Sequence, residues 1–191
     1  MKKKMNQILS GLNEIGIYGE KKIFINGIVN DSRKVQKNFI YVAIIGHDLD
    51  GHDFIDKAIE NGASVVICSN LPNKIDENIT YILVKNTKKA QGIVASNFYN
   101  DPSNRINVIM VTGTNGKTTV VSLFYSLFMS MKIKVGMLTT IENKINDKIY
   151  KSKLTTPDSI EINYYLSKMV DKKCEYCFME ASSHAIDQLR I

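Results

Sequence analysis

The feature that most constrains the fold is a short glycine-containing loop between an apolar run and a segment with helical spacing. Residues 107–111 are apolar after the first position, and apolar side chains recur at three- to four-residue intervals over residues 118–131. A strand, a glycine turn and a helix in this order open a nucleotide-binding α/β sheet. The continuous apolar run predicts a strand that is buried on both faces of a parallel sheet. The loop between the two segments is Gly113-Thr114-Asn115-Gly116-Lys117-Thr118-Thr119.

This loop has the groups that bind a nucleoside triphosphate. Consecutive backbone N–H groups at the start of a helix form a cradle for phosphate oxygens. Lys117 would neutralise the β and γ phosphates, and the Thr118 hydroxyl would bind Mg²⁺. The full pattern G-x-x-x-x-G-K-[ST] needs glycine at position 111, where this chain has Val111, so we expect a specialised subclass of phosphate loop. The alternative is an ordinary glycine turn with an exposed lysine.

Turn-forming residues at positions 100–104 divide the chain into two α/β blocks, and we predict a first domain over 1–101 and a second over 102–191. Both blocks alternate strand-like and helical patterns, which defines the fold class as α/β with a mostly parallel second sheet. Because the second block has room for about three strands, we expect it to be the first part of a larger domain. In the first block the expected strands are 22–29, 39–45, 64–69 and 80–84, and the expected helices are 53–61 and 87–99. In the second block, a strand at 135–139, a hairpin at 141–150, a helix opened by Thr156-Pro157-Asp158 and a strand at 176–180 follow the loop.

Composition excludes several classes of protein. The net charge is +6, but 22 of the 25 basic residues are dispersed lysines and there is no Trp, so we expect no nucleic-acid partner. The longest uncharged stretch, residues 118–131, is shorter than the roughly 20 residues of a membrane span. The basic N-terminus lacks the apolar core of a secretory signal, so we expect a cytoplasmic protein. Three cysteines, Cys68, Cys174 and Cys177, are interpreted as structural thiols rather than a disulfide framework or zinc site.

Residues 111–119 resemble the ATP loop of the Mur ligases, the ATP-dependent amide-forming enzymes of peptidoglycan precursor synthesis. Asp31-Ser32-Arg33 and the segments 39–43 and 46–55 are similar to the uridine-nucleotide-binding first domain of this family. Segments 154–158 and 179–190 resemble the members that add the third residue of the peptide. The resemblance covers nearly the whole chain, although family members are far longer.

The resemblance implies two groups of substrate-binding residues. Each has a plain structural alternative: serine and aspartate are common in turns, and Thr156 before Pro157 suits a helix N-cap. The UDP part would be held by Asn30, Ser32, His47, Asp48 and Leu49. The muramoyl-peptide part would be held by Thr155, Thr156, Ser182, Gln188 and Arg190.

Glu180 closes an apolar strand that we expect to lie beside the phosphate loop. A carboxylate there would be costly to bury without a cation, so we interpret Glu180 and Thr118 as ligands of Mg²⁺. Together with Lys117 they form the predicted catalytic set.

The implied reaction uses ATP to convert a D-glutamyl carboxylate of a UDP-muramoyl-peptide into an acyl phosphate, which the amine of an amino acid then attacks. The modified lysine, the histidine metal ligand and the C-terminal domain of the family cannot be placed on this sequence. We therefore expect that residues 1–191 do not catalyse ligation alone. We also expect a monomer. The alternatives are a neighbouring ligase, such as the dipeptide-adding or folylpolyglutamate enzymes, and a non-catalytic module that binds nucleotides or UDP-sugars.

Overall fold

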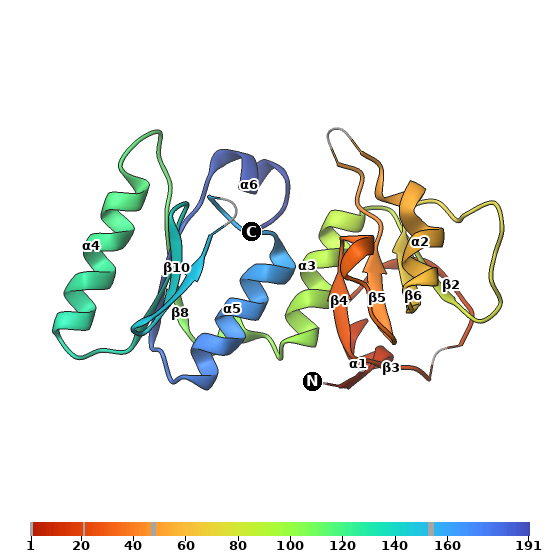
Figure 1. Cartoon of the computed structure of the whole chain (residues 1–191), viewed down its shortest axis with the longest axis horizontal. Coiled ribbons are helices and arrows are strands. Elements are labelled where there is room, and N and C mark those ends of the chain that lie inside the picture. The colour runs from red at the N-terminus through yellow and green to blue at the C-terminus, as the bar shows by residue number, and fades with distance from the viewer. Residues whose placement is uncertain (1, 21, 47–48, 153–154) are drawn as a thin grey trace. The chain divides into compact units, whose positions relative to one another are not determined.

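The structure is a computed structural model that describes residues 2–20, 22–46, 49–152 and 155–191. The chain forms two compact units, Met1–Phe98 and Tyr99–Ile191 (Figure 1). Each unit is an α/β sandwich built on its own five-stranded sheet. The division between the units lies a few residues before the expected one, at the end of a helix rather than within the turn-forming cluster.

The sheet of the first unit has the strand order β2-β7-β6-β5-β4. Strands β4 to β7 are parallel, and β2 adds an antiparallel edge. The strands are rich in β-branched residues whose alternate side chains face opposite helices, which explains their burial on both faces. The bounds are β2 Glu14–Tyr18, β4 Gly27–Val29, β5 Phe39–Val42, β6 Ala63–Cys68 and β7 Thr80–Val84.

Helices α2 (Ile55–Glu60) and α3 (Thr87–Phe98) lie on opposite faces of this sheet (Figure 1). Ile55 and Ala58 of α2 pack on Tyr41 of β5, on Ala43 just after this strand, and on neighbouring strand residues. A 3-10 turn, Gly51–Phe54, precedes α2, so the expected helix over 53–61 begins later than the pattern indicated. No pattern in the sequence pointed to the short N-terminal elements β1 (Lys3–Lys4) and α1 (Met5–Ile8), nor to β2.

The expected strand over residues 22–29 is two strands, β3 (Phe24–Ile25) and β4. Strand β3 pairs with β1, whereas β4 joins the main sheet. Asn26 separates them because its backbone N–H donates to Asn38 O and its side-chain amide donates to Lys37 O. These bonds take the chain out of the first pairing and into the second.

The sheet of the second unit has the order β11-β10-β9-β12-β8. Strands β8, β12 and β9 are parallel, and β10 and β11 form an antiparallel hairpin beside β9. The expected strands and the hairpin are therefore confirmed within a residue or two. The bounds are β8 Asn107–Val111, β9 Val135–Leu138, β10 Glu142–Ile145, β11 Lys148–Lys151 and β12 Tyr176–Glu180.

Helices α4 (Lys117–Ser130) and α5 (Ser159–Asp171) cover opposite faces of this sheet (Figure 1). Val121 and Tyr125 of α4 pack on Met137 and Phe178, whereas Met169 of α5 belongs to the cluster on the other face. The short helix α6 (Ser183–Asp187) follows β12. The structural alternative for Thr156, that it is the N-cap of α5, is wrong. Asp158 is the N-cap, because its Oδ1 accepts the Glu161 N–H at 2.9 Å.

The expectation that residues 107–111 form a strand buried on both faces is wrong. Strand β8 is an edge strand that pairs with β12 on one side, and no described strand pairs with its other side. Ile109 and Met110 are accordingly 39% and 51% exposed. Leu123 and Leu127, on the outer side of α4, are also exposed. An apolar run identifies a strand but not the number of its neighbours, which depends on the topology of the sheet.

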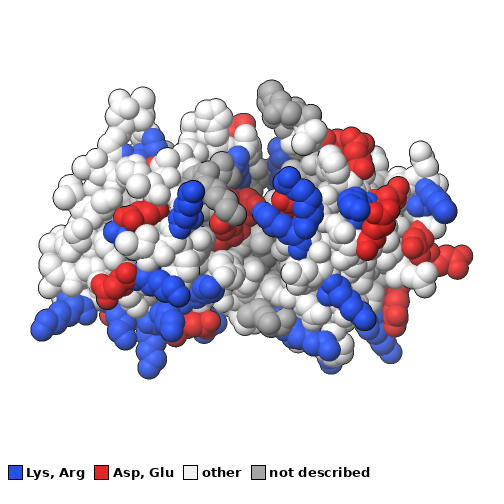
Figure 2. Space-filling model, viewed as in Figure 1, with Lys and Arg blue, Asp and Glu red and all other residues white. Residues whose placement is uncertain are grey.

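On the face shown in Figure 2, Lys and Arg stand among Asp and Glu. No helix in the described part of the chain is long and apolar enough to cross a membrane. All three cysteines are buried and free.

The unequal burial of α4 gives a prediction about stability. Val121 is fully buried whereas Leu123 is 65% exposed. Because truncation in a core removes contacts and leaves a cavity, Val121→Ala should lower the free energy of unfolding by about 2 kcal/mol. Leu123→Ala, the matched control, should change it by less than about 0.5 kcal/mol. Urea unfolding followed by circular dichroism measures both, and equal losses would contradict this account of α4.

Candidate functional site

The glycine loop connects β8 to the start of α4, as its sequence context predicts. Gly113 and Gly116 have φ angles of 143° and 80°, which residues other than glycine rarely adopt. A Cβ at Gly116 would meet no atom within 4 Å, so the backbone conformation at the start of α4, rather than crowding, requires glycine there. The loop between the two glycines is exposed, and its N–H groups stand at the positive end of the helix.

Lys117, the first residue of α4, folds back over this loop. Its Nζ donates to Gly113 O at 2.7 Å and to Thr114 O at 3.3 Å. An ammonium group has three donors, so these two bonds still allow a third to a phosphate oxygen. The fold therefore holds a cation directly above the loop.

Glu180 ends β12 in register with Val111 of β8, and only 1% of it is exposed. Thr118 Oγ1 donates to Glu180 Oε1 at 2.8 Å, which brings the two predicted metal ligands together. Thr140 also donates to Glu180, through its backbone N to Oε1 at 3.0 Å and through Oγ1 to Oε2 at 3.1 Å. The buried carboxylate thus has three hydrogen-bond donors. These donors offset the free-energy cost of burying the charge, for which the sequence analysis expected a cation to be needed.

Thr140 was not among the predicted site residues. It lies two residues beyond the end of β9, and Glu180 ends the neighbouring parallel strand β12. The carboxyl ends of parallel strands meet at one edge of a sheet, so a residue just after β9 is expected near the end of β12. The place of Thr140 after β9 could therefore have identified it as a site residue.

The donor set suits Mg²⁺. Thr118 and Glu180 offer hard oxygen atoms, and Mg²⁺ is typically bound through one or two protein oxygens together with substrate phosphates. Among the described residues there is no cluster of three or more His, Cys, Asp or Glu side chains that could hold a metal by itself. A cation bound jointly by this pair and a nucleotide fits the residues present.

Four of the five residues predicted to contact the peptide end form one hydrogen-bonded chain. Thr156 Oγ1 donates to Glu180 O at 2.9 Å and accepts from Ser182 N at 3.1 Å. Arg190 Nη1 donates to Thr156 O at 3.1 Å, and its Nη2 donates to the side-chain oxygen of Gln188. Ser182 also caps α6, since its Oγ accepts the Ala185 N–H. The fifth residue, Thr155, precedes Thr156 and is partly buried.

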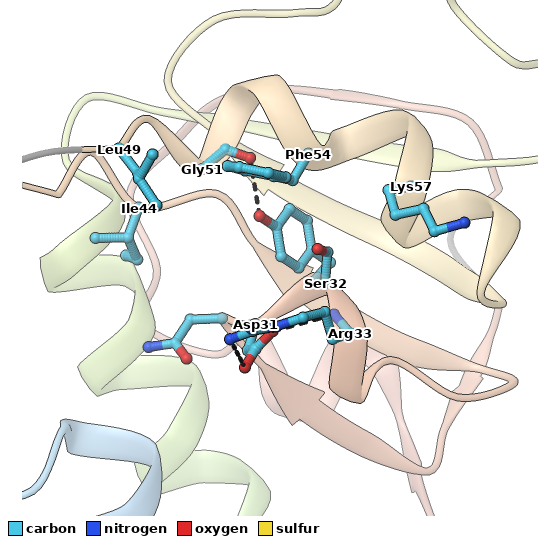
Figure 3. A pocket seen from close by; sticks show the side chains of 10 residues that line it. Asp31, Ser32, Arg33, Ile44, Leu49, Gly51, Phe54 and Lys57 are labelled. Carbon is cyan, nitrogen blue, oxygen red and sulfur yellow. Dashed lines mark hydrogen bonds and ion pairs between the residues drawn. The ribbon is translucent and has the colours of Figure 1, made fainter.

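The first unit contains a cavity of about 540 Å³ at the carboxyl end of β4 and β5 (Figure 3). Asn30, Ser32 and Leu49 line it, so the structure brings together three of the five residues predicted to bind UDP. The other two, His47 and Asp48, lie outside the described residues. Ile44 and Leu49 lie together on one side of the cavity, and Lys57 of α2 lies on the other.

An ion pair stands at this cavity. Arg33 Nε and Nη2 donate to the two carboxylate oxygens of Asp31 at 2.9 and 3.0 Å. The hydrogen bond from Arg33 lowers the pKa of Asp31 to about 2, so the carboxylate is charged at every physiological pH. Asp31 also accepts the Arg33 N–H at the start of the 3-10 turn Ser32–Lys34, which fixes the turn that presents Ser32 to the cavity.

Hydrogen bonds also fix the segment that follows β5. Tyr41 OH donates to Gly51 O at 2.8 Å, and burial raises the pKa of Tyr41 to about 12. Ser69 N donates to His52 Nε2 at 2.9 Å, so His52 carries its proton on Nδ1, which lies 2.6 Å from Asp50 Oδ1. The sequence alone predicts only a loop histidine at position 52. Its partner Ser69 lies 17 positions away, and a bond over that separation produces no local sequence pattern.

Two family models match the chain. The model of the Mur ligase family catalytic domain matches residues 24–109, and that of the Mur ligase middle domain matches residues 111–191.

Curated relatives agree with these matches. The chain is 43% identical over 188 residues to the UDP-N-acetylmuramoyl-L-alanyl-D-glutamate--2,6-diaminopimelate ligase of Phocaeicola vulgatus. This alignment covers 98% of this chain and 39% of the relative. The ligase of the same name from Cytophaga hutchinsonii is 45% identical over 93% of this chain and 37% of the relative. The chain therefore spans about two fifths of the length of these relatives.

Solved structures share the fold. A UDP-N-acetylmuramoyl-L-alanyl-D-glutamate--2,6-diaminopimelate ligase superimposes with a TM-score of 0.77 at 22% identity and covers all of this chain and 38% of that one. MurF ligase from Thermotoga maritima, solved in complex with ADP, gives a TM-score of 0.58 at 24% identity over 86% of this chain and 34% of that one.

The Tyr41 bond yields a prediction about stability and pH. Tyr41→Phe should lower the free energy of unfolding by about 1 kcal/mol at pH 8, because Gly51 O loses its donor. The pKa of Tyr41 is raised from 10.0 to about 12, so this stabilisation is full below pH 10 and is lost as the pH rises through 12. Urea unfolding at pH 8 and above pH 10 measures both effects. Tyr18→Phe, at a residue that is 46% exposed, is the control, and an equal loss there would contradict the assignment.

Proposed function

Because the chain belongs to the Mur ligase family, we propose that it is part of a ligase that adds the third amino acid to UDP-N-acetylmuramoyl-L-alanyl-D-glutamate. The observation that supports this most is the convergence of Lys117, Thr118 and Glu180 at one end of the second sheet. This arrangement suits the binding of ATP with Mg²⁺. The first unit adds a cavity with polar and cationic residues that suits a uridine nucleotide.

The proposed reaction proceeds in two steps. The γ-phosphoryl group of ATP passes to the D-glutamyl carboxylate and forms an acyl phosphate, while ADP leaves. The amine of the incoming amino acid then attacks the acyl carbon, an amide bond forms and inorganic phosphate leaves. Because the carboxylate and the γ-phosphate repel each other, catalysis depends on their positioning and on neutralising their charge.

Residues of this chain have definite roles in that scheme. The N–H groups of the loop between Gly113 and Lys117 bind the phosphate oxygens, and Lys117 Nζ places a positive charge over them. Thr118 and Glu180 would hold Mg²⁺, which supplies positive charge to the phosphates when it is bound. Thr156 links the Glu180 strand to Ser182 and Arg190, so the residues assigned to the peptide are tied to the phosphate site.

The first unit would bind the UDP part. Asn30 and Ser32 supply amide and hydroxyl groups to the base and sugar, and Leu49 and Phe54 supply apolar contact. Lys57 would provide a cation for the diphosphate by exchanging its exposed ion pair with Glu60, in which Nζ lies 2.9 Å from Oε2, for the phosphate oxygens. Arg33 is already paired with Asp31. We therefore propose that Arg33 shapes the cavity and also contributes positive charge to its lining.

Several statements about the whole protein belong to this proposal. The named relatives use 2,6-diaminopimelate, and we propose the same class of amino acid here. We also propose a cytoplasmic monomer. Because this chain spans about two fifths of those relatives, residues 1–191 alone should bind substrates without joining them.

Isothermal titration calorimetry tests the proposal. The chain should bind both UDP-N-acetylmuramoyl-L-alanyl-D-glutamate and ATP with Mg²⁺. Lys117→Met should weaken ATP binding by about tenfold or more, because the phosphates lose a charge-assisted partner, and should leave binding of the UDP substrate unchanged. Lys132→Met, just beyond the other end of α4, is the matched control and should change neither affinity.

Two results would contradict the proposal. Binding of ATP without any binding of the UDP substrate would indicate a general nucleotide-binding module. Formation of the tripeptide product by residues 1–191 alone would show that this portion is sufficient for ligation.

A further inference from the structure

We propose that Thr140 is a positioning residue that fixes the orientation of the Glu180 carboxylate for the divalent cation. The inference rests on the proposed function, in which Glu180 and Thr118 hold Mg²⁺ beside the nucleotide. It concerns a residue that lies outside both the loop motif and the short segments, 154–158 and 179–190, on which the family resemblance of the second block was based.

The geometry distinguishes Thr140 from Thr118. Thr118 donates to one carboxylate oxygen only, Oε1, at 2.8 Å. Thr140 donates to both oxygens, from its backbone N to Oε1 and from its Oγ1 to Oε2. A single donor leaves a carboxylate free to rotate about its last bond, whereas donors to both oxygens fix its plane. Thr140 therefore determines which lone pairs of Glu180 face Thr118.

The backbone holds Thr140 firmly in this place. Thr139, which is fully buried, donates from both its N–H and its Oγ1 to Glu142 O, at 3.3 and 2.7 Å. Glu142 N donates in return to Thr139 Oγ1 at 3.2 Å. These bonds close the turn between β9 and β10 with Thr140 inside it. The turn thus presents two donors at a fixed separation to the end of β12.

This arrangement matters for Mg²⁺ because that cation requires nearly ideal octahedral geometry. A carboxylate that is already oriented loses less freedom when the cation binds than one that rotates. The Thr140 donors come from the β9 end, whereas Thr118 comes from α4. The Thr140 bonds can therefore persist, and keep Glu180 in place, when the Thr118 hydroxyl gives up its bond to Glu180 and turns a lone pair toward the metal.

This role can be tested in the variant Thr140→Val by calorimetric titration with ATP, once in the presence of Mg²⁺ and once in EDTA without Mg²⁺. The variant keeps the shape and the backbone donor but lacks the hydroxyl. We expect the Mg²⁺-dependent gain in ATP affinity to fall by about five- to tenfold, while affinity in EDTA stays unchanged. Thr140→Ser, which restores a hydroxyl, should recover most of the gain. An unchanged gain, or an equal loss with and without Mg²⁺, would overturn the inference, because the second result indicates a general structural role.

A second measurement does not depend on ligand binding. In a double-mutant cycle of Thr140→Val and Glu180→Gln, the losses in the free energy of unfolding should be less than additive, because each change breaks the same contact. Additive losses would overturn the inference. If the unaltered chain does not bind ATP with Mg²⁺, the proposed function fails and the cation part of this inference fails with it. The cycle still decides whether Thr140 holds Glu180.

Discussion

The second unit is organised around one buried carboxylate. Glu180 is 1% exposed, and donors from α4 and from the turn after β9 converge on it at the end of β12. This convergence is possible because β8, β12 and β9 are parallel, so the segments that follow them meet at one edge of the sheet. The phosphate loop, the candidate metal ligands and the Thr156 chain thus occupy one edge and are joined through Glu180.

The first unit uses the same principle for a different chemistry. Its cavity forms where segments leave the carboxyl ends of β4 and β5, and hydrogen bonds act together with the apolar packing of Tyr41 to hold these segments in place. The Asp31–Arg33 pair fixes one side, and the Tyr41–Gly51 bond fixes another. Both units therefore place polar residues on backbone that parallel strands and local hydrogen bonds have already ordered, which lowers the cost of binding a flexible substrate.

Local patterns were enough to predict most of the second unit. The glycine loop, β12 and the β10–β11 hairpin follow from short-range signals, and the pairing of Thr118 with Glu180 follows from the loop motif and the strand end. What could not be predicted depends on residues distant in the sequence. Thr140 meets Glu180 across 40 positions, and His52 meets Ser69 across 17. The exposure of β8 likewise depends on which strands pair with it, and an apolar run contains no such information.

The most direct test of the central claim is a crystal structure of this chain with Mn²⁺ and a non-hydrolysable ATP analogue. The anomalous signal of Mn²⁺ locates the cation independently of the protein density. We predict a peak beside Thr118 Oγ1 and the Glu180 carboxylate, with the triphosphate over the loop and Thr140 still bonded to Glu180. A nucleotide bound with its cation away from both Thr118 and Glu180, and with their mutual hydrogen bond unchanged, would contradict the account.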